Sequence, residues 1–372
     1  MEQELKVEAI DGEGSLENNL IESNSLENHS LEDSSSDTNL SENSSSDSNS
    51  SDINQMEPQN LDVDSGSERD IRVYDWRWNQ QPVSIVYEVM GEGSPVLLLP
   101  ALSTISTRDE MRPLAEKLAL KHQVYLLDWV GFGESDRPRV KYEPKMFRMM
   151  LRAFVEETFN APIVVMAAGH AAGYVMDLVS DEPKPWAWVV LFAPTWRGPL
   201  PSMMGDGKRK WFGLIHGLVR SPILGQFLYW INTTRIFIKW MMKRHVYANK
   251  DSLTRERVRS KWKVAQGKGK RFASAAFVTG SLDPVKSSAT WLSYFQPIQV
   301  PVLMVIGEQM PPKSRGEAEV VAHFSGVQVV RTPGSLSLHE EYTDEVFAEI
   351  APFLSKYLSK PPEKHQPKTL DF

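Results

Sequence analysis

The sequence of 372 residues contains no cysteine. Disulfide bonds, thiolate metal sites and cysteine nucleophiles are therefore excluded together, and cysteine usage indicates no redox compartment. Long apolar runs are missing as well. The longest apolar region, residues 211–242, is interrupted by Arg220, Arg235 and Lys239, so it does not provide the roughly 20 apolar residues of a membrane-spanning helix. The first residues have neither the basic segment nor the apolar core of a signal peptide, and a cytoplasmic protein is expected.

Residues 1–70 are also poor in apolar side chains and consist mainly of Ser, Asn, Asp and Glu. They hold 19 acidic residues against only Lys6 and Arg69, whereas the rest of the chain holds 39 basic residues against 29 acidic ones. A segment of this composition cannot bury enough apolar surface to fold, so we expect residues 1–70 to form a disordered acidic tail. The tail either keeps the protein soluble or binds, as an acidic strap, to the basic surface of the remaining chain.

The chain after residue 70 alternates between strand and helix patterns. Apolar and polar residues alternate with period two in Tyr74–Trp78 and Val83–Val89, which predicts two antiparallel strands. The later strands are short, continuous apolar runs, which are typical of a parallel sheet with helices on both faces. The sequence therefore predicts an α/β fold with a mostly parallel central sheet. Its further strands are expected at 95–100, 123–128, 163–166, 188–194, 300–307 and 327–331, and helices at 108–121, 144–159 and 343–358.

Residues 195–270 interrupt this alternation with helical patterns that are rich in aromatic and basic residues. We expect an inserted helical subdomain there, with 71–194 and 271–360 as the two parts of the core and 361–372 as a polar terminus. Basic residues on exposed helices are usually solvated, but interleaved aromatic residues such as Trp230 are also typical of a surface that binds anionic lipid. No nucleic-acid-binding motif accompanies the charge, so no nucleic-acid partner is expected.

The segment after the apolar run Ile163–Val165 has the spacing of a catalytic turn. Gly169 and Gly173 lie two positions on either side of Ala171, as the glycines do in the Gly-x-Ser-x-Gly turn that lifts a serine nucleophile above a sheet. The strand pattern before the turn and a helix pattern from Tyr174 give it the expected context. Alanine has no group that can attack a substrate, so this turn is predicted to lack its nucleophile.

A second motif, at Asp128–Pro138, reads Asp-Trp-Val-Gly-Phe-Gly-Glu-Ser-Asp-Arg-Pro and follows an earlier strand. Together with the order of the elements and the turn at 169–173, it resembles the α/β-hydrolase superfamily over about residues 72–360. The resemblance implies the α/β-hydrolase fold, an esterase-like or lipase-like activity in active relatives, and a lid over the substrate site at residues 195–270. Asp128 and Ser135 are expected to stabilise their own turn.

Active relatives use a nucleophile, an acid and a histidine in that chain order. The resemblance places these three at Ala171, Met310 and Leu336. Met310 replaces the Asp of a Gly-Glu-x-Asp pattern, and Leu336 replaces the first His of a Gly-His-x-Pro-His-Glu-Glu pattern that ends at His339–Glu341. The other common position for the acid, at residues 194–195, offers no carboxylate. All three positions are apolar, so we predict a degenerate catalytic triad.

The backbone of such a site does not depend on these side chains. By the same resemblance, Leu102 and Ala172 are expected to supply the two N–H donors of the oxyanion hole, with Ser103 and His170 beside them. His339 is the alternative candidate for a base. No metal ion or other cofactor is expected.

Three functions are compatible with these observations. The first is a non-catalytic protein that binds an apolar or ester-like ligand, or a partner, in the hydrolase pocket. The second is an active hydrolase with relocated catalytic groups, such as His339 or His170 with Ser103. The third is a peripheral membrane protein that docks on an anionic membrane surface through its basic, aromatic lid.

Overall fold

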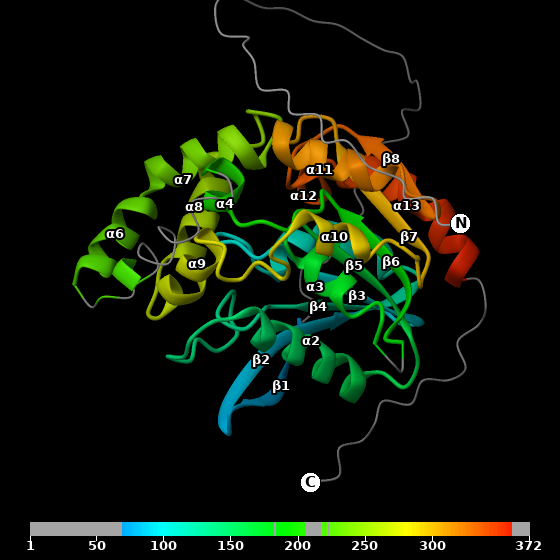
Figure 1. Ribbon diagram of the computed structural model, residues 1–372, viewed down its shortest axis with the longest axis horizontal. Coiled ribbons are helices and arrows are strands. Elements are labelled where there is room, and N and C mark those ends of the chain that lie inside the picture. The colour runs from blue at the N-terminus through cyan, green and yellow to red at the C-terminus, as the bar shows by residue number, and fades with distance from the viewer. Residues whose placement is uncertain (1–68, 182–183, 205–216, 220, 222, 359–372) are drawn as a thin grey trace, which may run out of the picture. The chain divides into compact units, whose positions relative to one another are not determined.

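An eight-stranded sheet forms the centre of the computed structural model, which describes residues 69–181, 184–204, 217–219, 221 and 223–358 (Figure 1). Its spatial order is β1-β2-β4-β3-β5-β6-β7-β8. Strand β2 runs antiparallel to both of its neighbours, and all the other neighbouring strands are parallel. The strands are β1 (Asp70–Trp78), β2 (Gln81–Met90), β3 (Ser94–Leu99), β4 (His122–Leu127), β5 (Ile163–Ala168), β6 (Trp186–Phe192), β7 (Val302–Gly307) and β8 (Val327–Thr332).

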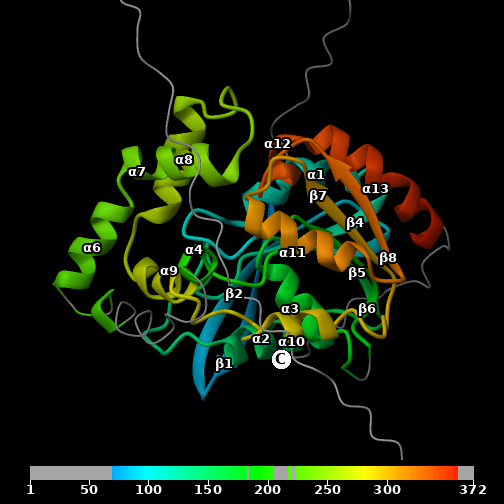
Figure 2. The same ribbon diagram turned by 45° about the horizontal axis from the view of Figure 1, so that its top comes forward.

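Helices cover both faces of this sheet. Figure 2 shows α1 (Arg112–Leu118) and α13 (Thr343–Leu358) together on one face, and α2 (Pro144–Thr158) and α3 (Ala171–Asp177) on the other. The predicted α/β architecture with a mostly parallel sheet is confirmed. Strands β5 and β7 are buried along their whole length, since they lie between helices on both faces.

One predicted helix is divided in the structure. Residues 108–121 form a 3₁₀ helix, η1 (Arg108–Met111), followed by the separate α1. The Thr107 side chain caps η1 by accepting a hydrogen bond from Asp109 N, and Pro113 lies in the first turn of α1, where its missing N–H costs nothing. Helical periodicity alone does not distinguish one long helix from two short ones.

Helical segments lie between β6 and β7 in the part of the chain that the structure describes, and we call those named below the inserted helices. Among the described residues these helices extend beyond residue 270, the predicted end of the insertion, because α9 starts at Lys270 and α10 follows α9. Their own small apolar cluster includes Ile238, Met242 and Tyr247, together with Ile105 from the loop after β3. The inserted helices are α4 (Pro199–Met204), α6 (Leu224–Asn232), α7 (Arg235–Met241), the π-helical η3 (Met242–Val246), α8 (Arg255–Ala265), α9 (Lys270–Val278) and α10 (Ser288–Ser293).

The turn after β4 is held by a buried carboxylate. Asp128 accepts hydrogen bonds from the backbone N–H groups of Arg108, at 2.7 Å, and Glu134, at 3.0 Å, and pairs with the Arg108 guanidinium. The Ser135 hydroxyl donates to the carbonyl of Asp128 at 2.7 Å. Both residues therefore stabilise their own turn, as the sequence predicts.

Two expectations concern chain segments outside this description. The acidic tail falls almost entirely in residues 1–68, and the polar terminus falls in 359–372, so both stay predictions. Strand β1 begins at Asp70, one residue before the predicted start of the core. In the described part of the chain, no helix is long and apolar enough to cross a membrane.

Candidate functional site

The turn after β5 has its left-handed residue at Gly169, whose φ is +51°. A Cβ atom at Gly169 would lie 3.3 Å from the Cβ of Ala101, in the loop after β3, and 3.9 Å from the Oγ1 of Thr195, in the loop after β6. Ala171 is completely buried and already begins helix α3. The tip of the turn is therefore two residues earlier than the glycine spacing predicts. Spacing does not reveal which residue takes the positive φ, and glycine takes it without strain.

The two expected oxyanion donors are Ala172 and Leu102. The N–H of Ala172 donates to the carbonyl of Gly169 at 3.3 Å. Leu102 is completely buried in the loop after β3, directly after Ala101, whose own N–H donates to Oε1 of Glu110 at 2.7 Å. Donor roles for Ala172 and Leu102 both stay predictions.

The predicted acid and histidine positions lie on two neighbouring loops, which follow β7 and β8. Gln309 joins these loops, because its N–H donates to the Gly334 carbonyl at 2.9 Å and its Oε1 accepts from the Gly334 N–H at 2.6 Å. Met310 is 4% exposed, and Leu336 packs against the main apolar core. The fold therefore brings positions 310 and 336 to the same edge of the sheet, and both side chains there are apolar.

His170 lies apart from that edge. Its Nε2 is 2.9 Å from the carbonyl oxygen of Leu282, and its ring packs edge-on against Phe277 at 5.3 Å between centroids. Burial lowers the pKa of His170 to about 4, so the imidazole is neutral at ordinary pH. Its contacts are those of a core residue that fixes the segment after α9.

Ser103 makes its hydrogen bonds within its own loop. Its Oγ lies 2.9 Å from the Oγ of Ser106 and accepts a hydrogen bond from the N–H of Ile105 at 3.2 Å. No contact joins Ser103 to His170 or His339 in the described residues, so the structure does not assemble the pair of a relocated nucleophile and base.

His339, like His170, lies beside a carboxylate. The Nε2 of His170 is 3.8 Å from Oδ1 of the buried Asp283, whereas His339 belongs to a group of several charged side chains. Its ring is completely buried, stacks on Phe192 at the end of β6, and places Nε2 at 3.7 Å from Oε1 of Glu110. Burial acts to raise the pKa of Glu110, but the neighbouring His339 and the charge of Lys261 outweigh it and keep the pKa below its usual value. Glu110 is therefore an ionised carboxylate in the interior.

Lys261 links this pair to the inserted helices. Its Nζ lies 2.9 Å from Oε2 of Glu340 and 3.9 Å from Oε2 of Glu110, and Tyr247 donates to Oε2 of Glu340 at 2.6 Å. Glu341 accepts two further hydrogen bonds from the backbone that follows η3. The cluster of Glu110, His339, Lys261, Glu340 and Tyr247, which we call the buried charge cluster, therefore attaches the inserted helices to the loop after β8.

Sequence reasoning did not identify Glu110 or Lys261 as members of a site. Both occur among other charged residues on helical patterns, at Arg108–Arg112 and Arg255–Lys263, where most side chains are expected in solvent. Only the packing of three distant segments shows that these two are buried. Within the described residues, no group of three or more His, Asp or Glu side chains is arranged to bind a metal ion.

The arrangement of strands and helices is similar to that of several solved enzymes. The Cif epoxide hydrolase from Acinetobacter nosocomialis superposes with a TM-score of 0.60 over 77% of this chain and 90% of its own, at 14% identity. An esterase from Thermogutta terrifontis superposes with a TM-score of 0.59 over 78% of this chain and 100% of its own, at 17% identity. A bromoperoxidase from Bacillus anthracis superposes with a TM-score of 0.58 over 76% of this chain and 100% of its own, at 19% identity.

At these identities the likeness shows the fold alone. A comparison of the sequence with models of known protein families finds no match, and a comparison with curated protein sequences finds none either.

Proposed function

We propose that this chain, whose fold is that of the α/β-hydrolases, is a binding protein that has lost the hydrolytic chemistry. The observation that carries the proposal is the turn after β5, where the left-handed tip residue is Gly169 and the residue given by the motif spacing is Ala171. Neither side chain can act as a nucleophile. With apolar Met310 and Leu336 at the other two positions, only binding and backbone donors remain, which give roughly 10³–10⁴ over the reaction in water.

The ligand class that fits this site is apolar or ester-like. Ala171 and Met310 are almost completely buried and Leu336 packs on the core, so the polar groups of a hydrolase site are replaced by apolar surface. The inserted helices act as the lid over this region in the proposal. The bonds from Lys261 and Tyr247 to Glu340 hold the lid closed, and entry of a ligand or partner requires them to break.

The test combines activity with labelling. The full chain should hydrolyse p-nitrophenyl esters no faster than a heat-denatured control, and fluorophosphonate probes should label no serine. Native mass spectrometry of the purified protein should then show whether an apolar ligand accompanies it. Turnover that disappears in His339→Ala or Ser103→Ala while the fold is retained would instead establish a hydrolase with relocated groups.

A second candidate function, docking on an anionic membrane surface, is favoured by one face of the inserted helices. Apolar side chains that are usually buried are exposed on α6 and α7, including Trp230 at 60% and Ile236 at 85%. Exposed cations alternate with them, and the sequence has no Asp or Glu between Asp206 and Asp251. Aromatic and aliphatic side chains beside Lys and Arg are the combination that binds the interface of an anionic bilayer. The apolar residues of this face are Leu224, Phe227, Trp230, Ile231, Ile236 and Trp240, and its cations are Arg235, Lys239, Lys243 and Arg244.

Co-sedimentation with vesicles tests this docking face. The protein should bind phosphatidylcholine vesicles that contain phosphatidylserine, bind pure phosphatidylcholine weakly, and dissociate as salt is added. Trp230→Glu combined with Trp240→Glu should abolish binding. Leu120→Glu is the matched control, because Leu120 is 82% exposed but follows α1 outside this face. Equal binding by the double variant and the control would exclude the face.

A further inference from the structure

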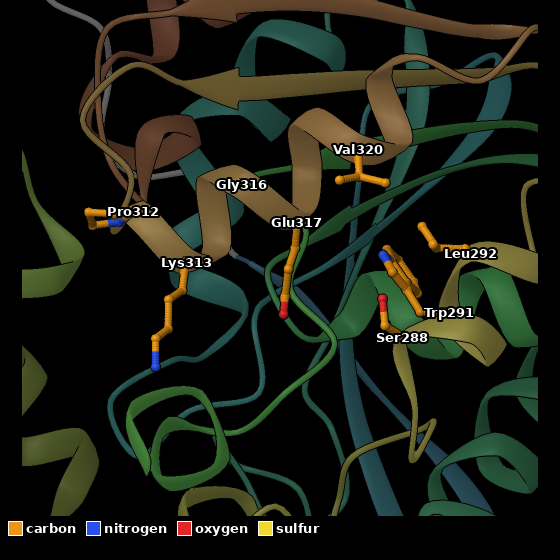
Figure 3. Close-up of a pocket in the computed structure, with 8 residues that line it drawn as sticks. All are labelled: Ser288, Trp291, Leu292, Pro312, Lys313, Gly316, Glu317 and Val320. Carbon is orange, nitrogen blue, oxygen red and sulfur yellow. The ribbon is translucent and has the colours of Figure 1, made fainter. Parts of the chain in front are cut away.

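A cavity of about 880 Å³ lies where the loop after β4, α6 and the start of α9 meet. Among the described residues, its lining includes the cationic residues Arg137, Arg139, Lys268 and Arg271 and no carboxylate. A smaller cavity, of about 300 Å³, lies between α10 and α11 (Pro312–Ala322), and Figure 3 shows Lys313 and Glu317 together on its wall. The larger cavity is therefore distinguished by a one-sided charge.

Three cations of the larger cavity, Arg137, Arg139 and Lys268, form no ion pair with a carboxylate that the structure describes. Arg139 and Lys268 are exposed and make no ion pair or hydrogen bond with any described residue. Arg137 donates to the carbonyl of Gly133 through one terminal nitrogen, but its buried Nε has no acceptor among the described residues. Arg271 donates to Oε1 of Gln226 at 3.0 Å, which joins the start of α9 to α6.

The backbone adds positive potential to the same cavity. Gly269 caps α9 with a φ of +83°, and a Cβ atom there would lie 3.2 Å from the Cβ of Arg137. The glycine thus permits the start of α9 to pack against Arg137, and the first N–H groups of a helix carry partial positive charge. Next to the cap, burial and then the charge of Arg137 lower the pKa of Lys270 to about 8, although Asp128 and Glu134 oppose them.

We infer that this cavity is a binding site for a ligand that carries a phosphate group with at least two negative charges. Arginine guanidinium groups bind phosphate oxygens through paired hydrogen bonds. Surface charges that are only solvated have no need to gather on one concave wall, as these cations do. The phosphate belongs either to a soluble phosphorylated compound or to a lipid headgroup, since Gln226 of α6 lines the cavity on the helix that carries Phe227 and Trp230. The inference is independent of the proposed loss of hydrolysis.

Isothermal titration of the full chain with inorganic pyrophosphate in a chloride buffer tests the site. Saturable one-to-one binding is expected, and Arg139→Ala combined with Lys268→Ala should weaken it about tenfold. These two positions are exposed, so their loss should leave the fold intact. The matched control is Lys145→Ala with Arg259→Ala, which removes the same two charges from exposed positions outside the cavity. Absence of binding, or equal weakening by both double variants, overturns the inference.

Vesicles then distinguish the two sources of phosphate. If phosphatidic acid in phosphatidylcholine vesicles binds the protein, and pyrophosphate displaces the protein from those vesicles, the ligand is a lipid headgroup. If pyrophosphate binds but does not compete with the vesicles, or the vesicles do not bind, the ligand is a soluble phosphorylated compound. The variant Trp230→Glu, which lies outside the cavity lining, should affect only vesicle binding.

Discussion

The Nε2 atom of His339 lies 3.7 Å from Oε1 of Glu110, and both side chains are at most 2% exposed. Glu110 comes from the 3₁₀ helix after β3 and His339 from α12 (Leu338–Glu341), so the pair joins segments that are far apart in the sequence. In a hydrolase a buried acid and histidine would activate a nucleophile. In the described residues, neither ring nitrogen of His339 has a hydrogen-bond partner, and Lys261 connects the pair to α8.

The first prediction concerns Lys261. Lys261→Met removes the cation between Glu110 and Glu340 and leaves these two largely buried carboxylates without a neutralising charge from α8, so the free energy of unfolding should fall by about 3 kcal/mol. Urea denaturation followed by fluorescence measures the change. Lys263→Met, two residues along the same helix and exposed, serves as the control and should change stability by less than about 0.5 kcal/mol. Equal effects of the two substitutions would show that the cluster does not stabilise the fold.

The second prediction concerns the pH dependence of stability through His170. Its pKa is about 4 in the folded protein against an ordinary 6.5, so between these values the unfolded chain binds a proton that the folded chain does not. Stability should therefore fall as the pH is lowered through this window, by about 3 kcal/mol in total from this group. His170→Gln keeps a donor for the Leu282 carbonyl and should remove this component. An unchanged pH profile in the variant would contradict the assignment.

The third prediction identifies the residue with the positive φ in the turn after β5. Gly169→Ala places a Cβ atom at a φ of +51° and 3.3 Å from the Ala101 Cβ, so it should destabilise the protein by about 1–2 kcal/mol. Gly316→Ala, in the open middle of α11, should instead stabilise by about 0.5–1 kcal/mol. Thermal unfolding of both variants measures the contrast. If Gly169→Ala left the stability unchanged, Gly169 would not be the residue with the positive φ, and Ala171 would again be the expected tip of the turn.

The fourth prediction concerns the pH dependence of pyrophosphate binding. Lys270 is charged below about pH 8, and the groups that face it are Arg137, Asp128 and Glu134. Raising the pH from one unit below to one unit above this value should weaken binding several-fold relative to Lys270→Met, which has no ammonium to lose. Comparison with the variant removes the change in the charge of pyrophosphate itself. Parallel pH profiles for the two proteins would show that Lys270 does not contribute.

Much of the fold followed from the sequence because each strand is a local pattern. The period-two alternation in β1 and β2 and the apolar runs of β3 to β8 report directly which faces are buried. The sequence predicted a turn between β5 and a helix, and the structure has a turn there, at Gly169 and His170. The helix begins at Ala171, earlier than expected, and the residue with a positive φ depends on the close approach of Gly169 to Ala101 and of Gly173 to Pro284.

The sequence by itself determined the class of fold and the place of the insertion between β6 and β7, because both follow from residue type and local period. Only the tertiary structure decided that Glu110, His339 and Lys261 form one buried charge cluster, and that Arg137, Arg139, Lys268 and Arg271 line one cavity. These residues are distant in the chain and ordinary in their local sequence. Burial and mutual charge, which give them their chemistry, arise only when the segments pack together.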